Sequence, residues 1–177
     1  MNANSLPDET HVPARLKRDK TFQPCLVESG DEHYANGIFE FNITRLLAFI
    51  GTCPERFPVE RVLVEDFPAF GSSHLNEETV LNADLSRPIL LAEISPRRFN
   101  VIDGNHRLAR ARRERVQMVP ARRVLCPDHV PFLISEWAYE KYVEYWNSKV
   151  EVLSPAKAPR KHRKASLGNR PCELTDT

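Results

Sequence analysis

The sequence predicts an α+β domain, because segments with the alternation of strands and segments with the spacing of helices follow one another along its 177 residues. Helical patterns begin at or beside residues 45, 76, 105 and 135. A hydrophobic content of 41% is enough for one core, so we expect a single domain with tails. Strand patterns lie at residues 38–44, 59–64, 88–94, 99–102 and 116–125.

The early elements are bounded by turn and stop signals. Asn36-Gly37 is typical of a tight turn and precedes the strand at 38–44. The apolar residues 45–50 predict a short helix that ends at Gly51 or Pro54.

The later elements carry caps and one irregularity. Asn76, followed by two glutamates, predicts the capped start of a helix. Pro120 has no N–H group and indicates that the strand at 116–125 lies at a sheet edge or is irregular. Ser135 predicts the N-cap of a helix whose apolar face we expect to pack on the sheet, with partner binding or base stacking as the alternative. That face consists of Ala138, Tyr142, Tyr145 and Trp146.

The domain organisation follows from composition. Residues 1–22 are polar and charged and predict a flexible segment, residues 23–150 form the domain, and residues 151–177 form a basic flexible tail. The four cysteines are widely separated, which predicts reduced thiols rather than a metal or disulfide site. No signal peptide or membrane-length apolar run is visible, so we expect a cytoplasmic protein without a membrane partner.

A strand-to-helix junction gathers the residues with the most chemistry. Gly104 permits a sharp turn, and Asn105 is the predicted N-cap of the helix that follows. A helix start offers free amide donors and partial positive charge to an anion. Arg107 adds a fork for phosphate oxygens, His106 can exchange a proton, and Asp103 can bind a divalent metal or accept a proton. The alternative is that these residues form only a capped turn.

Basic residues are concentrated around this junction. Residues 103–123 contain seven arginines against two acids, although the whole chain has a net charge of only +1. Such a patch suits a polyphosphate or a nucleic-acid backbone, and Arg110, Arg112 and Arg113 are the candidate contacts to DNA. A solvated helix face is the alternative.

The junction, residues 101–111, resembles the signature of the ParB/sulfiredoxin fold, together with residues 119–124. Residues 87–91, in which a Pro-Ile pair introduces a strand, resemble the first box of that family, and the likeness covers about residues 58–126. The resemblance implies a compact mixed sheet with flanking helices and a nucleotide, ATP or CTP, whose phosphates bind at the junction. It assigns phosphate contacts to Gly104, Asn105, His106 and Arg107, and a catalytic or metal-binding role to Asp103. We expect Mg²⁺ to bridge those phosphates and a carboxylate. We expect Arg87 to help neutralise the charge of the phosphates.

Departures from the family narrow the expected function. Sulfiredoxins carry a reactive cysteine where this chain has Asn105, and chromosome-partitioning members carry Glu-Arg-Arg and a further DNA-binding domain. The Asp-Gly-x-His-Arg form is closer to free-serine kinases and to small plasmid-encoded fertility-inhibition or oncogenic-suppression proteins with ATPase and DNase activity. We therefore expect a phosphohydrolase acting on ATP and DNA, with a conjugation-system protein as a further partner. The alternatives are a small-molecule kinase and a non-catalytic, nucleotide-responsive DNA-binding adaptor.

The expected hydrolase needs an acid that orients the attacking water, and His106 would stabilise the leaving oxygen. Asp103 or an acid from an early strand can fill the first role. Glu65 is preferred because it closes the strand at 59–64, ahead of Glu40 and Asp66.

Overall fold

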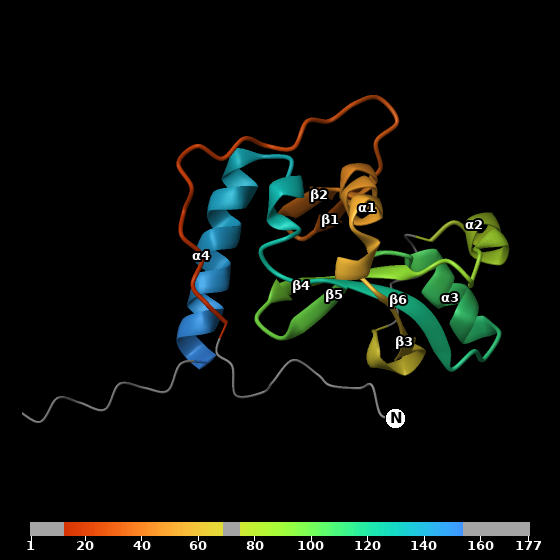
Figure 1. Ribbon diagram of the computed structural model, residues 1–177. Coiled ribbons are helices and arrows are strands. Elements are labelled where there is room, and N and C mark those ends of the chain that lie inside the picture. Colours follow the sequence, from red (N-terminus) through yellow and green to blue (C-terminus); the bar gives the residue numbers. More distant parts are fainter. Residues whose placement is uncertain (1–12, 69–74, 154–177) are drawn as a thin grey trace, which may run out of the picture.

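The computed structural model describes residues 13–68 and 75–153. A four-stranded mixed sheet forms its centre, in the order β3-β6-β4-β5, with β4 and β6 parallel and the other pairs antiparallel (Figure 1). A two-stranded hairpin, β1-β2, lies beside it. The strands are β1 (His33–Asn36), β2 (Phe39–Asn42), β3 (Val59–Leu63), β4 (Ile89–Ser95), β5 (Arg98–Asp103) and β6 (Met118–Val124). The helices are α1 (Ile43–Thr52), α2 (Glu77–Asn82), α3 (Asn105–Arg113) and α4 (Glu136–Leu153).

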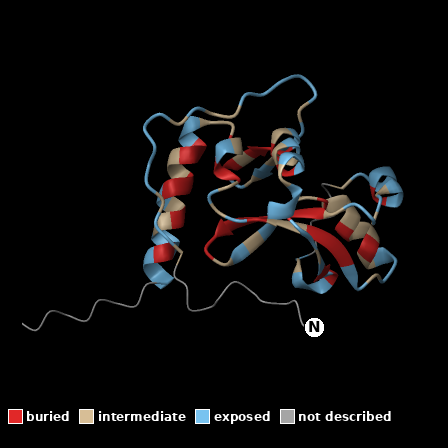
Figure 2. Cartoon of the chain, in the orientation of Figure 1, coloured by how far each residue is buried: buried red, intermediate tan, exposed pale blue. Residues whose placement is uncertain are grey.

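The core is built around β4, every residue of which is buried (Figure 2). Alternate side chains of a strand point to opposite faces of the sheet, so β4 contributes to two apolar layers. Leu90, Ala92 and Ile94 pack in the cluster that also contains residues of α1, α4 and β2. Ile89 and Leu91 pack in the cluster with residues of α3. Helices therefore flank both faces, and the predicted α+β class with a mixed sheet is confirmed.

Local signals placed most boundaries correctly. Gly37 has a φ of +66° in the β1-β2 turn, and Asn76 and Ser135 cap α2 and α4 by accepting from Thr79 N and Ala138 N. The strand predicted at 38–44 is wrong at its end, since α1 begins at Ile43. The reason is a cap that the pattern did not reveal: Asn42 Oδ1 accepts the amide of Arg45 at 3.0 Å.

Pro120 lies in an inner strand, so its predicted position at a sheet edge is wrong. β6 pairs with β3 on one side and with β4 on the other. The parallel ladder with β4 begins only at Ala121, which pairs with Ile89. Pro120 precedes that ladder, so an inner strand can carry it at this point.

The helix α4 packs through the predicted face. Ala138, Tyr142 and Trp146 are buried in the core cluster, and Tyr145 packs against it, so the core interpretation of this helix is confirmed. α4 continues to Leu153, three residues past the predicted domain end. The remainder of the predicted basic tail, 154–177, and residues 1–12 lie outside the described residues. Within the part of the chain that is described, no helix is both long and apolar enough to cross a membrane.

Residues 13–22 are fixed along α4, so the prediction of a flexible segment is wrong for this range. The side chain of Asn147 accepts from Leu16 N at 2.8 Å and donates to Leu16 O at 3.0 Å. Tyr139 Oη accepts the amide of Asp19 at 2.7 Å, and its ring stacks on Phe22 with centroids 3.9 Å apart. Backbone groups of residues 16 and 19 are therefore paired with side chains of the helix, which fixes this segment against it.

We expect Asn147→Ala to release this segment, because both hydrogen bonds to Leu16 disappear. The free energy of unfolding should fall by about 1–3 kcal/mol, and amide exchange over residues 13–22 should accelerate. Urea denaturation and hydrogen-exchange mass spectrometry measure the two effects. Ser148→Ala is the control, since that hydroxyl donates only to Tyr145 O in its own helix. Unchanged exchange in Asn147→Ala would contradict the assignment.

A buried histidine lies between α4 and β4. His129 is fully buried, and its Nε2 lies 2.9 Å from Tyr142 Oη, whose proton goes to Glu93 O at 3.1 Å. The Tyr142 hydroxyl has one proton, which it donates to Glu93 O, so His129 Nε2 is assigned as the donor to Tyr142 Oη. Burial lowers the pKa of His129 from 6.5 to about 4, against a smaller opposing effect of the Leu125 backbone.

This pKa makes folding sensitive to acid. Below pH 6.5 the unfolded chain binds a proton at His129 that the folded protein does not bind until about pH 4. As the pH is lowered from 6.5 to 4, the free energy of unfolding of the wild type should therefore fall by about 1.4 kcal/mol per pH unit relative to that of His129→Gln. Urea melts of both proteins from pH 7.5 to pH 4 test this, since all other groups are common to both. If the free energy of unfolding depended on pH in the same way in both proteins, protonation of His129 would not be linked to folding.

Candidate functional site

The β5-α3 junction turns at a single glycine. Gly104 has a φ of +101°, and α3 begins directly after it. Gly104 is therefore the N-cap and Asn105 the first helical residue, so the predicted cap at Asn105 is wrong. The N-cap Gly104 has no side chain with which to cap the helix, and the first intrahelical hydrogen bond runs from Leu108 N to Gly104 O at 3.0 Å. The amides of residues 105–107 precede that bond and have no intrahelical acceptor.

An ion pair crosses this turn. Arg107 Nη2 donates to Asp103 Oδ2 at 2.8 Å, and the Arg107 side chain is only 12% exposed. Within residues 13–68 and 75–153, Arg107 Nε is buried and has no hydrogen-bond partner. An unpaired donor on a buried guanidinium is costly, and an anion placed against it would lower that cost.

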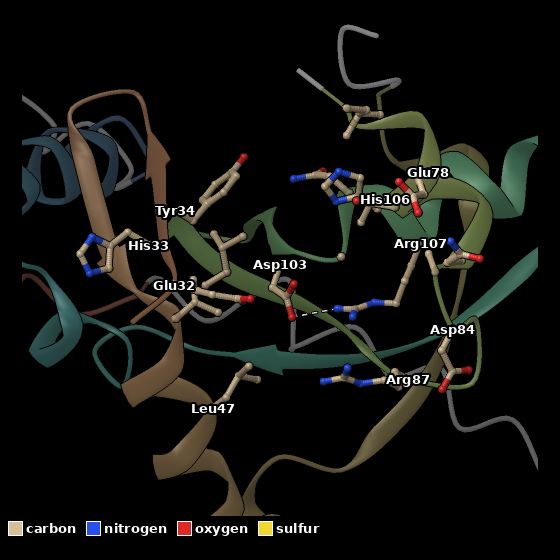
Figure 3. Close-up of a pocket in the computed structure, with 18 residues that line it drawn as sticks. Glu32, His33, Tyr34, Leu47, Glu78, Asp84, Arg87, Asp103, His106 and Arg107 are labelled. Carbon is tan, nitrogen blue, oxygen red and sulfur yellow. Dashed lines mark hydrogen bonds and ion pairs between the residues drawn. The ribbon is translucent and has the colours of Figure 1, made fainter. Parts of the chain in front are cut away.

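The junction forms one wall of a cleft of about 870 Å³ (Figure 3). The opposite wall is β1 with the residue before it, and α2 with the loop after it forms a third side. Six residues predicted as site residues line this cleft together: Arg87, Asp103, Gly104, Asn105, His106 and Arg107. A volume of this size accommodates a nucleotide-sized ligand.

Among the cleft residues that were not predicted, four carry a carboxyl or phenol group: Glu32, Tyr34, Glu78 and Asp84. The hydroxyl and amide of Ser86, with Arg87 and Arg107 nearby, hold the pKa of Asp84 below its usual value. The Asp-Leu-Ser spacing ahead of Arg87 is a turn signal that could have identified Asp84. The other three reach the cleft through tertiary packing and left no local signal. Burial raises the pKa of Tyr34, and its contact with the Asn105 side chain opposes that rise.

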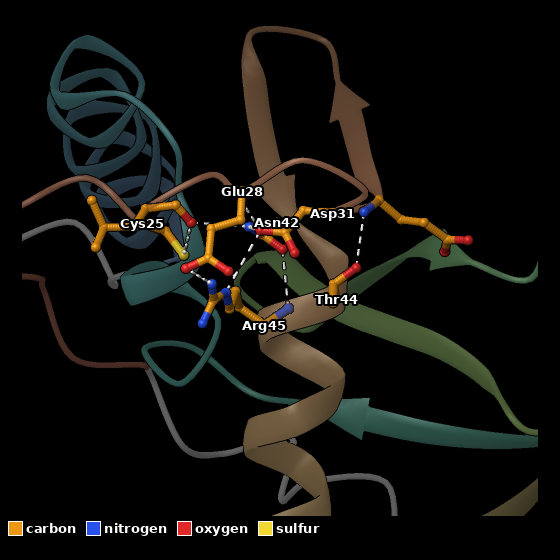
Figure 4. Close-up of polar contacts among 8 residues, drawn as sticks. Cys25, Glu28, Asp31, Asn42, Thr44 and Arg45 are labelled. Atoms are coloured by element: carbon orange, nitrogen blue, oxygen red, sulfur yellow. Dashed lines mark hydrogen bonds and ion pairs between the residues drawn. The ribbon is translucent and has the colours of Figure 1, made fainter.

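A polar network fixes the chain ahead of β1 and so places Glu32 at the cleft (Figure 4). Asn42 is fully buried and donates to Asp31 Oδ2 at 2.7 Å, while Thr44 Oγ1 accepts the Glu32 amide at 2.8 Å. Hydrogen bonds from the Glu28 amide and the Asn42 side chain hold the pKa of Asp31 below its usual value. The charged carboxylate is thereby kept as the acceptor on which this network depends.

Glu65 does not line the cleft, so the structure does not bring it to the junction as predicted. It lies in a 3₁₀ turn, η2 (Val64–Asp66), that follows β3, and it lines a separate cavity with Arg112 and Arg115. β3 is an edge strand, two strands away from β4 and three from β5, so its end cannot reach the junction. Glu40, the weaker choice, lies 3.5 Å from His33 Nδ1 and does not line the cleft.

The arginines predicted to contact DNA are engaged within the protein. Arg110 contacts Glu114 and Ala83 O, and Arg113 forms two hydrogen bonds of 2.7 Å with Glu77. Arg112 donates to Phe67 O and Pro68 O. These contacts attach α3 to α2 and to the chain after β3, which gives each guanidinium a structural role.

The described residues do not form a preformed magnesium site. Among the described residues, no group of three or more His, Cys, Asp or Glu side chains is placed to hold a metal ion. Asp103, the predicted ligand, has one oxygen engaged by Arg107. The donor set therefore does not fit a preformed cation site.

Comparison of the chain with protein-family models, with curated protein sequences and with solved structures finds no significant match.

We expect Gly104→Ala to destabilise the protein by about 2–5 kcal/mol, since it combines backbone strain with overpacking. An added Cβ would lie 2.6 Å from Ile89 Cγ2 and 2.9 Å from Arg107 Nη2. Gly37→Ala is the matched control, because Gly37 also has a positive φ but nothing within 4 Å, and about 1–2 kcal/mol is expected there. Equal losses in urea melts of the two variants would refute the close packing at Gly104.

Proposed function

We propose that the protein binds a nucleotide at the β5-α3 junction and hydrolyses its terminal phosphate bond. The observation that carries this proposal is the convergence of the uncapped α3 N-terminus, Arg87, Arg107, His106 and Asp103 on one cleft. Amide donors and guanidinium groups recognise phosphate oxygens, while a carboxylate and an imidazole can move protons. The resemblance of residues 101–111 to the ParB/sulfiredoxin signature supports the same ligand.

Each residue has a defined role in the proposed reaction. The amides of residues 105–107 and Arg87 hold the phosphates, and Arg107 offsets the charge that develops on them. Asp103 Oδ1, the oxygen not used by Arg107, accepts a proton from the attacking water. Water forms the new bond to the terminal phosphorus as the bond to the bridging oxygen breaks, and His106 donates a proton to that leaving oxygen.

Transfer to a small acceptor is the second candidate, and the shape of the cleft favours it over a nuclease. The cleft continues from the junction to Glu32, Tyr34 and Glu78, which present carboxylates and a phenol to a second molecule. A hydroxyl-bearing acceptor with an amino group suits that chemistry. The DNA-directed activity has less support, since Arg110, Arg112 and Arg113 already have partners within the protein.

The test is phosphate release from ATP and from CTP in magnesium-containing buffer, with and without duplex DNA and with a panel of amino acids. Asp103→Asn should lower kcat by about 100-fold or more, because it removes the proton acceptor, while His106→Gln should cause a smaller loss. Glu114→Gln, the same chemical change at the far end of α3, should behave as wild type.

The outcomes separate the candidates. Phosphorylated product in the presence of an amino acid would favour the kinase, and stimulation by DNA would favour the nuclease. Nucleotide binding without phosphate release, in the wild type and in all variants, would support the non-catalytic, nucleotide-responsive adaptor. Full activity of the Asp103→Asn variant would contradict the assignment of the β5-α3 junction as the active site.

A further inference from the structure

A second, smaller recess adjoins the cleft. It has a volume of about 220 Å³ and lies among α1, the start of β4 and β6. Leu47, Arg87, Asp103 and Arg107 line both cavities, so the Asp103–Arg107 pair stands where the two meet. In Figure 3, Leu47 and Arg87 lie on one side of this pair and Tyr34 and His106 on the other. The recess is too small for a whole nucleotide but has room for phosphate groups.

Charge distinguishes the two cavities. The large cleft is lined by two arginines against four carboxylates, which belong to Glu32, Glu78, Asp84 and Asp103. The small recess is lined by three arginines, Arg87, Arg107 and Arg122, against the single carboxylate of Asp103. The side chains that line the recess therefore carry a net positive charge, and those that line the large cleft carry a net negative charge.

Strand pairing explains how Arg122 reaches this position. Leu90 of β4 pairs with Asp103 of β5 on one side and with Arg122 of β6 on the other. Residues paired across a sheet project from the same face, so Asp103, Leu90 and Arg122 form a row. Two strand spacings separate the outer members, about 10 Å between their backbones, and side chains of this length can approach a common ligand across it.

The guanidinium of Arg122 is held in place but not neutralised. Its Nη1 donates to Phe57 O at 2.8 Å, a neutral acceptor. Within the described parts of the chain, neither Arg122 nor Arg87 forms an ion pair, whereas Arg107 is paired with Asp103. An oriented guanidinium whose charge has no counterion is suited to bind phosphate oxygens.

We propose that the small recess is the subsite for the terminal phosphates of a nucleoside di- or triphosphate, with Arg122 as a specificity-determining residue. This inference rests on the proposed binding of a nucleotide at the junction and adds the direction in which it lies. The phosphate nearest the nucleoside contacts the α3 amides, and the chain of phosphates runs past Asp103 toward Arg122. The nucleoside remains in the larger, more acidic cavity, where donor groups of the base find carboxylate acceptors.

The test is isothermal titration calorimetry at fixed ionic strength with AMP, ATP and inorganic triphosphate, and with CMP and CTP in parallel. Arg122→Met should weaken binding of the triphosphates about tenfold or more, because a charge-assisted contact is lost. The affinity for the monophosphates should change by less than about twofold, since they do not reach the recess. Arg122→Lys, which keeps the charge and guards against a folding defect, should lose less than Arg122→Met.

Arg123→Met is the matched control. Arg123 is the next residue of β6, but it projects from the other face of the sheet and pairs with Glu60 at 2.6 Å. The affinity of the Arg123→Met variant for every ligand should equal that of the wild type. Equal weakening of mono- and triphosphates by Arg122→Met, or no weakening at all, would overturn the subsite.

The same titrations distinguish this inference from the proposed function. In one outcome, the wild type binds inorganic triphosphate in a way that depends on Arg122 and yet binds no nucleotide. That result would support the phosphate subsite and contradict the proposed binding of a nucleotide. No binding of any phosphate by the wild type would overturn both.

Discussion

The left-handed backbone at Gly104 is the constraint on which the candidate site depends. A φ of +101° lets the chain change from strand to helix at one residue, and Ile89 packs where a side chain would otherwise be. Asp103 and Arg107 then lie on either side of the turn and meet at 2.8 Å. A longer connection would separate this pair, and a side-chain cap would occupy the amides at the start of α3. The features that favour an anion at this point thus come from a single backbone geometry.

The sheet topology brings two further arginines, Arg87 and Arg122, to the junction. Because β4 runs antiparallel to β5 and parallel to β6, the start of β4 lies beside the end of β5 and beside Arg122. Arg87, two residues ahead of β4, is brought to the same end of the sheet. Complete burial of β4 keeps this alignment rigid, since its apolar side chains pack on both faces. Residues far apart in the sequence are therefore held within reach of one ligand.

Several turns and caps were predictable from the sequence, although the N-caps of α1 and α3 were not. Placement across the sheet was not predictable. Gly104, Asn76 and Ser135 act through their own backbone or the next turn, so a single sequence reveals them. The position of Pro120 depends on strand order, and a proline pattern cannot distinguish an edge strand from an inner strand whose second ladder begins one residue later. Glu65 was assigned to the site because it ends a strand, but β3 lies at the far edge. The cleft residue Glu32 depends on a network around Asn42, which no local pattern encodes.

The density of arginines in the sequence overstates the positive surface of the fold. Within residues 103–123 the contacts of most arginines are internal, with Asp103, Glu114, Glu77 and Glu60 as acidic partners and backbone carbonyls as neutral ones. A guanidinium paired with a carboxylate attracts a phosphate far less than one bonded to a carbonyl, because its charge is already balanced. Arg122 belongs to the second kind and lines the small recess, whereas Arg113 on α3 belongs to the first. The attraction for phosphate is therefore concentrated beside the junction rather than along α3, which favours a small polyphosphate ligand over a nucleic-acid backbone.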